Sequence, residues 1–248
     1  MAKPRHLARA PIIEAVLDIG VAPRQSGDFT ALQKAFESLD FGYKQQSFVV
    51  SGTLGFVINP EAEVQQSGQA AKIGLRLQSQ DEKYVALVRT NGFSLSRLAP
   101  YENWEALQSE ARKIWEIYVK RWTPDKVVRL ATRYINNLRL PLAIGQSFSN
   151  FINTLTELPP EVPQSLGQFV QQFQCLDPSS RSQVRLSLAW NGQVDNGRIP
   201  VILDIDVSTM QQFDPADAAM WSQFRSLREL KNRCFFGTLQ EEALKEYT

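Results

Sequence analysis

Charged side chains recur inside apolar segments of the sequence that are predicted to be strands. Glu14 and Asp18 lie in the first such segment, and Arg129 and Arg133 lie in a later one. Because neighbouring side chains of a strand point to opposite faces, the two residues of each pair share a face. A pair of arginines can bind a carboxylate or phosphate group, and a nearby carboxylate can assist. The sequence therefore offers one candidate site for a small anionic ligand or a nucleotide.

Two interpretations of this charged sheet face stay open. In the structural one, the charges form cross-strand ion pairs, each contributing about 0.2–1 kcal/mol. In the functional one, they line a polar groove between two halves of the protein. Asp204 and Asp206 could also hold a divalent cation, but two carboxylates alone do not define a metal site, so no metal or cofactor is predicted. The candidate ligand-binding residues are Glu14, Asp18, Arg76, Arg129, Arg133, Asp204 and Asp206.

Catalytic signatures are missing from the sequence. It contains no G-x-S-x-G, G-x-x-x-x-G-K-[ST], G-x-G-x-x-G or H-E-x-x-H motif. The single histidine, His6, cannot build a His/Cys metal cluster and is poorly placed as a catalytic base. Cys175 and Cys234 lie in apolar contexts that predict buried, reduced thiols. No catalytic residue is predicted, and the balance favours a protein without enzymatic activity.

The elements that would position these charges follow from hydrophobic periodicity. Strands are predicted over 11–21, 47–58, 71–79 and 83–90, with a helix that starts at Asp28. Trp104, Leu107 and Ala111 begin a stripe with helical spacing, which predicts a long helix over 101–122. Its tryptophans are expected in the core rather than stacked on nucleic-acid bases.

The order of elements then restarts. A strand over 126–140 is followed by a helix near 146–156, strands over 168–176, 182–190 and 200–208, and a helix capped by Asp214-Pro215. The tail, 237–248, is expected to dock on its own domain. We therefore predict an α+β fold with two similar β-α-β-β-β-α halves, 1–124 and 125–248, related by a pseudo-two-fold axis. Mainly antiparallel sheet would be backed by the long amphipathic helices.

Composition narrows the class of partner. Lys and Arg number 27 against 26 for Asp and Glu, so no basic field attracts nucleic acid, and nucleic-acid binding is not expected. No run of about 18 apolar residues is present and the first residues lack a signal-peptide pattern, which predicts a cytoplasmic protein without membrane contact. A protein partner, a homo-oligomer or a small anionic ligand remain the partners to consider.

Three stretches together resemble a known family: LARAPIIEAVLDI (7–19), YENWEALQSEARKIWEIY with VVRLATRYINNLRLP (101–118 and 127–141), and MWSQFRSLRELKNRCFFGTL (220–239). They are similar to a sporadically distributed family of uncharacterised bacterial and archaeal proteins of about this length. The resemblance implies a cytosolic prokaryotic protein, and patchy distribution suggests genes of defence or toxin–antitoxin systems. It carries over no catalytic residue. We expect a non-enzymatic protein-interaction or regulatory module, with the anionic-ligand binder, or even a hydrolase, as the alternative.

Overall fold

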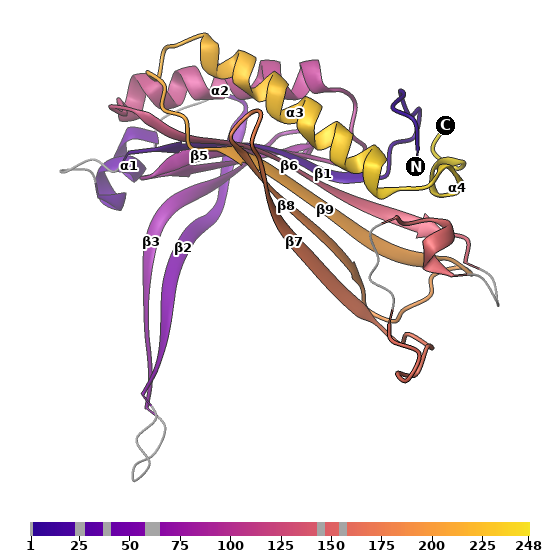
Figure 1. The fold of residues 1–248 in the computed structure, drawn as a ribbon. Helices are drawn as coiled ribbons and strands as arrows, with labels where there is room; N and C mark the ends of the chain where they lie inside the picture. The colour runs from indigo at the N-terminus through magenta and orange to yellow at the C-terminus, as the bar shows by residue number, and fades with distance from the viewer. Residues whose placement is uncertain (1, 23–27, 37–40, 58–64, 143–146, 154–157) are drawn as a thin grey trace.

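The protein is built on one large, curved antiparallel sheet with its two long helices on one side (Figure 1). The computed structural model describes residues 2–22, 28–36, 41–57, 65–142, 147–153 and 158–248. The mixed α+β fold class agrees with the prediction. Within the described residues, none of the helices combines the length and the apolar character needed to cross a membrane.

The elements have the following bounds in chain order. They are β1 (Ile12–Val21), α1 (Phe29–Phe36), β2 (Tyr43–Val57), β3 (Gln65–Ser79), β4 (Tyr84–Arg89), β5 (Gly92–Leu98), α2 (Trp104–Trp122), β6 (Val127–Leu140), the 3-10 turn η1 (Phe148–Asn150), β7 (Phe169–Asp177), β8 (Ser182–Trp190), β9 (Ile199–Thr209), α3 (Ala219–Thr238) and α4 (Glu241–Leu244).

The sheet is arranged about its two central strands. In the described residues its nine strands follow the order β2-β3-β4-β5-β1-β6-β9-β8-β7, and all neighbours are antiparallel. β1 and β6, the first strands of the two predicted halves, lie side by side. β1 pairs on its other side with β5, and β6 pairs with β9, the last strand of its half. From there the strands run outward in reverse chain order to the edges β2 and β7.

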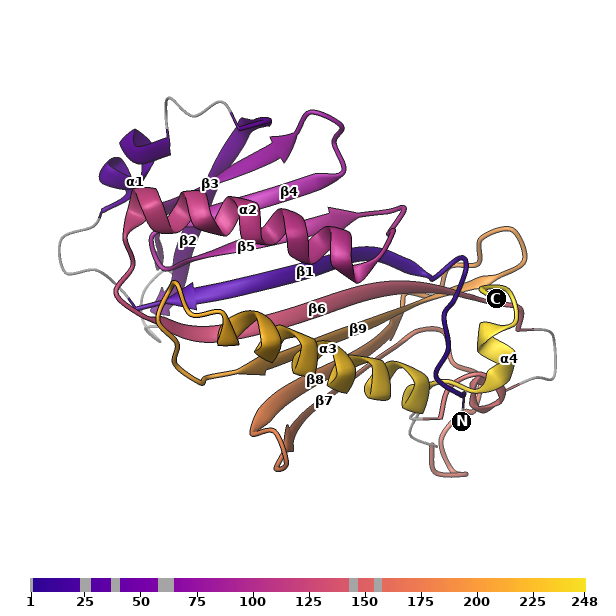
Figure 2. The same ribbon diagram turned by 90° about the horizontal axis from the view of Figure 1, so that it is seen from above.

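One face of the sheet is covered by α2 and α3 (Figure 2). β1 buries Ala15, Leu17 and Ile19 completely, in the alternation that the sequence predicts. The tryptophans of α2 are buried in this core, as expected, and Trp115 stacks on Tyr118 with ring centroids 5.2 Å apart. The hairpins β2–β3 and β7–β8 lie at the two edges of the sheet, and both bend away from the helices (Figure 1). The other face of the sheet is therefore concave.

The structure differs from the predicted β-α-β-β-β-α pattern in both halves. The first half has four strands after α1, because 92–98 is a strand rather than a lead into the helix. Phe93 and Leu95 face the helices there, while Ser94 and Ser96 face the open side, and all four are buried. In the second half, the helix predicted near 146–156 is a single 3-10 turn within the described residues, and part of that range lies outside them.

Two helix starts also differ from the prediction. α2 begins at residue 104, where the Asn103 side chain caps it by accepting from the backbone N–H of Ala106 at 2.8 Å. α3 begins at residue 219 instead of Asp214, because Phe213 forms an antiparallel bridge with Val127 that keeps the chain extended.

The two ends of the chain pack together beside α3 (Figure 2). The backbone N–H of Ala2 donates to the Leu239 carbonyl at 2.8 Å, and Arg5 pairs with Glu241 at 2.8 Å. Leu244 of α4 is fully buried. The tail therefore docks on its own chain, as predicted.

Candidate functional site

The charged residues identified from the sequence lie on the concave, helix-free face of the sheet. Asp18 on β1 is the centre of the first group. Its Oδ2 accepts from Arg89 Nη2 on β4 at 2.6 Å, and its Oδ1 accepts from Arg129 Nη1 on β6 at 2.7 Å. Gly20 and Gly92 leave room for these long side chains, since a Cβ at Gly20 would lie 3.1 Å from Arg129 Cβ. One carboxylate thus links strands on both sides of β1.

The second group lies across β6, β9 and β8. Arg133 donates from Nε and Nη2 to the two carboxylate oxygens of Asp204, at 2.8 and 2.6 Å. Asp206 accepts from Arg185 at 2.9 Å and lies 3.7 Å from Arg129. Burial raises the pKa of Asp206, against the opposite effect of its arginine neighbours. The hydrogen bond to Asp204 raises the pKa of Arg133.

A shallow pocket of about 290 Å³ lies among these charges. Small side chains of the central strands form its floor, and charged side chains form its rim. Its lining includes Val16, Ser94, Ser96 and Ala131 on the floor and Glu14, Asp18, Arg129, Arg133 and Asp206 on the rim. Five of the seven predicted site residues therefore meet at one place.

The other two predicted residues lie outside the lining. Asp204 belongs to the group through Arg133, whereas Arg76 on β3 lies on the same face opposite Leu87. Both pocket arginines are occupied by carboxylates, so an incoming anion must compete with Asp18 and Asp204. The geometry is that of a cross-strand ion-pair network. In the described part of the chain no group of three or more His, Cys, Asp or Glu residues could hold a metal ion.

A larger cavity, of about 690 Å³, lies on the helix side of the sheet. It is bounded by the segment before β1, the start of α2, the second half of α3, and β6. Its size falls within the range of about 300–1,000 Å³ that is typical of small-molecule sites. Its lining includes aromatic side chains and several polar groups: Tyr101, Trp104, Tyr134, Phe235, Phe236, Asn136, Arg228, Lys231 and Asn232.

Lys231 is the unusual group in this cavity. It is only 7% exposed, and its Nζ lies 3.7 Å from the centroid of the Tyr134 ring. The Tyr134 hydroxyl is 3.2 Å from that of Tyr101. Burial, together with the nearby Arg228, lowers the pKa of Lys231 to about 7. A buried amine with this pKa gains or loses its proton near neutral pH, so its charge changes there.

Sequence reasoning missed Lys231, although the signal is present. The buried residues Met220, Phe224, Leu227, Phe235 and Thr238 recur at helical spacing, and position 231 lies in the same stripe of α3. A charged residue at a core position of an amphipathic helix is unusual, and this pattern alone would have marked Lys231 as a candidate.

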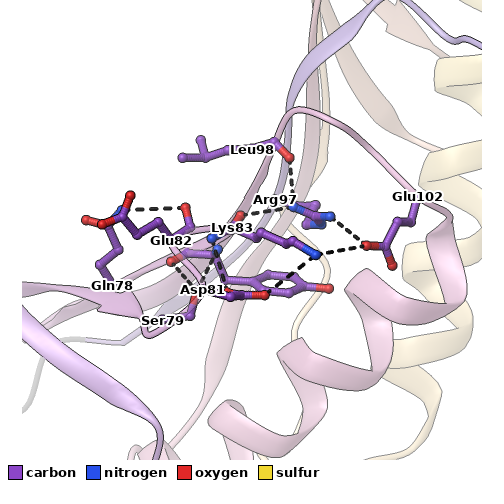
Figure 3. Close-up of polar contacts among 9 residues, drawn as sticks. Gln78, Ser79, Asp81, Glu82, Lys83, Arg97, Leu98 and Glu102 are labelled. Carbon is purple, nitrogen blue, oxygen red and sulfur yellow. Dashed lines mark hydrogen bonds and ion pairs between the residues drawn. The ribbon is translucent and has the colours of Figure 1, made fainter.

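Arg97 of β5 is a second buried cation, and its partner Glu102 lines this cavity. Figure 3 shows the contact between the two side chains. Arg97 is 1% exposed, donates to the Leu98 carbonyl at 3.0 Å and to Glu102 at 2.7 Å, and lies over the Tyr84 ring. Its Nε has no hydrogen-bond partner. Lys83 also lies 3.8 Å from Glu102. These contacts join the β4–β5 hairpin to the chain just before α2, which forms one wall of the cavity.

The two cysteines are free, and one prediction about them was wrong. Cys234 is partly buried, but Cys175 is exposed, because it lies on the edge strand β7.

Sequence comparisons were made with protein-family models and with curated proteins. No protein-family model matches the chain, and no curated protein matches it either.

Proposed function

We propose that this protein is a non-enzymatic interaction module that associates through the edge strand β7, and that its partner is a second copy of itself. The observation that supports the proposal is the character of that edge. β7 (Phe169–Asp177) contains no proline and carries no charge before its last residue, Asp177, and its pairing with β8 has no register shift. Natural edge strands are usually protected by charges, bulges or prolines.

The opposite edge, β2, differs in these respects. It carries Lys44, and its pairing with β3 shifts register twice, between Gln45 and Ser47 and between Val49 and Val50. Such irregularities hinder pairing with another strand. β7 is therefore the edge that favours association.

The β7 sequence is complementary to itself in an antiparallel pair. If Phe173 of one copy lies opposite Phe173 of the other, Val170 lies opposite Leu176 and Gln172 lies opposite Gln174. Val170 is 82% exposed and Leu176 is 66% exposed, and both face the concave side. The two-fold contact would bury both apolar pairs and extend the sheet across two chains. A single strand pair buries less than a standard interface, so the expected Kd is micromolar to millimolar.

Sedimentation equilibrium over a wide concentration range tests this proposal. We expect a monomer–dimer equilibrium that Val170→Lys abolishes, because two lysines would then face apolar side chains. The double variant Val170→Lys, Leu176→Glu should restore the dimer through two cross-strand ion pairs. Val50→Lys on the β2 edge, at a position 61% exposed, is the matched control and should leave the equilibrium unchanged.

A chain that stays monomeric at millimolar concentration would contradict the proposal. So would a dimer that Val170→Lys leaves intact, or a double variant that is no better than the single one. Capture of an unrelated protein by the monomer would refute the second-copy assignment.

A second candidate function is the binding of a small anionic ligand at the pocket on the concave face. It is favoured by Arg129 and Arg133 on the rim of that pocket. Pyrophosphate is a suitable probe for calorimetry. Arg133→Gln should weaken its binding, whereas Asp204→Asn should strengthen it by releasing Arg133. Arg139→Gln is the control, because Arg139 lies at the far end of β6 and pairs with Asp195. Absence of binding, or equal effects of these variants, would exclude this function.

The proposal also includes the origin and setting of the module. We infer that the halves 1–124 and 125–248 descend from a duplication, which the similar strand order on both sides of β1 and β6 supports. The expected setting is the prokaryotic cytoplasm, in a regulatory or defence-associated role, as the resemblance of the sequence implies. Halves that match different families, rather than each other, in related sequences would contradict the duplication.

A further inference from the structure

The helix-side cavity has the features of a small-molecule site, separate from both surfaces discussed above. Its volume is about 690 Å³, and it lies between α2, α3, β6 and the segment before β1. Aromatic side chains supply much of its wall, among them Tyr101, Trp104 and Phe235. A cavity of this kind accepts a flat apolar group, because the rings offer large and rigid contact surfaces.

Lys231 provides the polar end of this site. Its side chain lines the cavity, is more than nine-tenths buried, and lies over the Tyr134 ring. In the described part of the chain, the titratable groups that act on it electrostatically are Arg228 and the Cys234 thiol, and neither is a carboxylate. A buried ammonium without a counter-ion is costly, and an anion bound beside it would remove that cost.

The groups that surround Lys231 are neutral or cationic, so the space beside its ammonium suits an anion. Tyr134 on β6 and Tyr101 before α2 are phenols, and burial raises the pKa of each, so both remain neutral donors. Arg228, on the same helix, lies over the Trp104 ring. The cavity wall also holds two carboxylates near the start of α2, Glu102 and Glu105. Glu102 pairs with Arg97.

We propose that this cavity binds a small aromatic carboxylic acid, with its ring against the aromatic wall and its carboxylate paired with the Lys231 ammonium. The hydroxyls of Tyr101 and Tyr134 are hydrogen-bonded to each other, so one O–H of this pair is left to donate to the same anion. Above neutral pH the amine must take up one proton from solvent when the acid binds, because only the ammonium form pairs with a carboxylate. Binding is therefore proton-linked.

Isothermal titration calorimetry with 2-naphthoate tests the proposal, and 2-naphthamide is the neutral analogue of the same shape. We expect the wild-type protein to bind naphthoate about ten- to a hundredfold more tightly than naphthamide. Naphthoate affinity should fall about tenfold for each pH unit above the Lys231 pKa. Titrations in buffers of different ionisation enthalpy should report close to one proton taken up per naphthoate.

Variants locate the binding. Lys231→Met should remove the preference for naphthoate over naphthamide. Lys120→Met, at an exposed position of α2, and Arg133→Gln, on the concave face, should leave it unchanged. The inference is overturned if naphthoate does not bind at millimolar concentration, if the amide binds as tightly, or if Lys231→Met binds naphthoate like the wild type. Loss of binding in Arg133→Gln alone would instead assign the anion to the concave face.

Discussion

Replacing Lys231 with methionine should remove a specific pH dependence of stability. Burial lowers the pKa of Lys231 from the ordinary 10.5 to about 7 in the folded protein. Between these values the unfolded chain binds one proton more than the folded chain. The free energy of unfolding therefore rises with pH, by about 1.4 kcal/mol per unit from this residue. Below pH about 7 the folded protein carries the full cost of a buried ammonium, of the order of 5 kcal/mol.

Methionine is close to lysine in length and can pack against the Tyr134 ring without a charge. We expect Lys231→Met to be more stable than the wild type near neutral pH, with an advantage that shrinks as the pH rises. The assay is urea unfolding, followed by tryptophan fluorescence and far-UV circular dichroism, at several pH values above neutrality with the cysteines kept reduced. The difference between the two proteins should change by about 1.4 kcal/mol per pH unit.

The groups that titrate in the same range occur in both proteins, but Cys234 interacts with Lys231 electrostatically. Burial raises the pKa of Cys234 above the ordinary 9.0, so its contribution to stability decreases only as the pH rises from 9.0 towards that raised value. Below pH 9.0 the comparison therefore isolates Lys231. Lys120→Met, at an exposed position, should keep the wild-type slope. Parallel pH profiles for Lys231→Met and the wild type would refute the reasoning.

Two further predictions concern the sheet. Asp18→Asn should lower the free energy of unfolding by about 1.5–3 kcal/mol, because it weakens two charged hydrogen bonds between strands. Arg185→Gln, at a half-exposed arginine, should lower it by less than about 1 kcal/mol. Equal losses in urea unfolding would contradict the central role of Asp18. Gly92→Ala should destabilise the protein by several kcal/mol, since its φ is +153° and a Cβ would lie 2.3 Å from the Ile19 carbonyl oxygen. Gly197→Ala, with φ +71° and open space around it, should cost only about 1 kcal/mol, and a similar thermal shift for both would count against the steric argument.

The sequence was sufficient to predict the faces of the strands. The alternation in 12–21 places Asp18 and Glu14 on one side and Leu17 and Ile19 on the other, and the structure agrees. Ile13 is the exception, being 40% exposed, because the register of β1 with β6 shifts between Ile12 and Glu14. Local periodicity predicts a face correctly only where the pairing is regular.

The pairing of strands distant in the sequence could not be predicted in the same way. Nothing local in the sequence indicates that Asp18 would lie between Arg89 and Arg129, since that depends on β1 lying near both strands. The strand 92–98 was missed because both of its faces are buried, and Ser94 and Ser96 on one of them concealed the apolar run. The cavity around Lys231 depends on the packing of four separate elements, so only the misplaced lysine in α3 pointed to it.

The central position of β1 has a consequence for the order in which the chain can fold. Glu14 pairs with Leu98 and Ile12 pairs with Asn136, so the first strand has no neighbour in the sheet until much of the chain has been made. At about 5–20 residues per second, synthesis leaves this apolar strand without its partners for roughly 4–25 s. Contacts so distant in sequence also slow folding itself. During that interval the nascent strand is a target for chaperones or for mispairing, which makes the rate of translation a factor in the yield of folded protein.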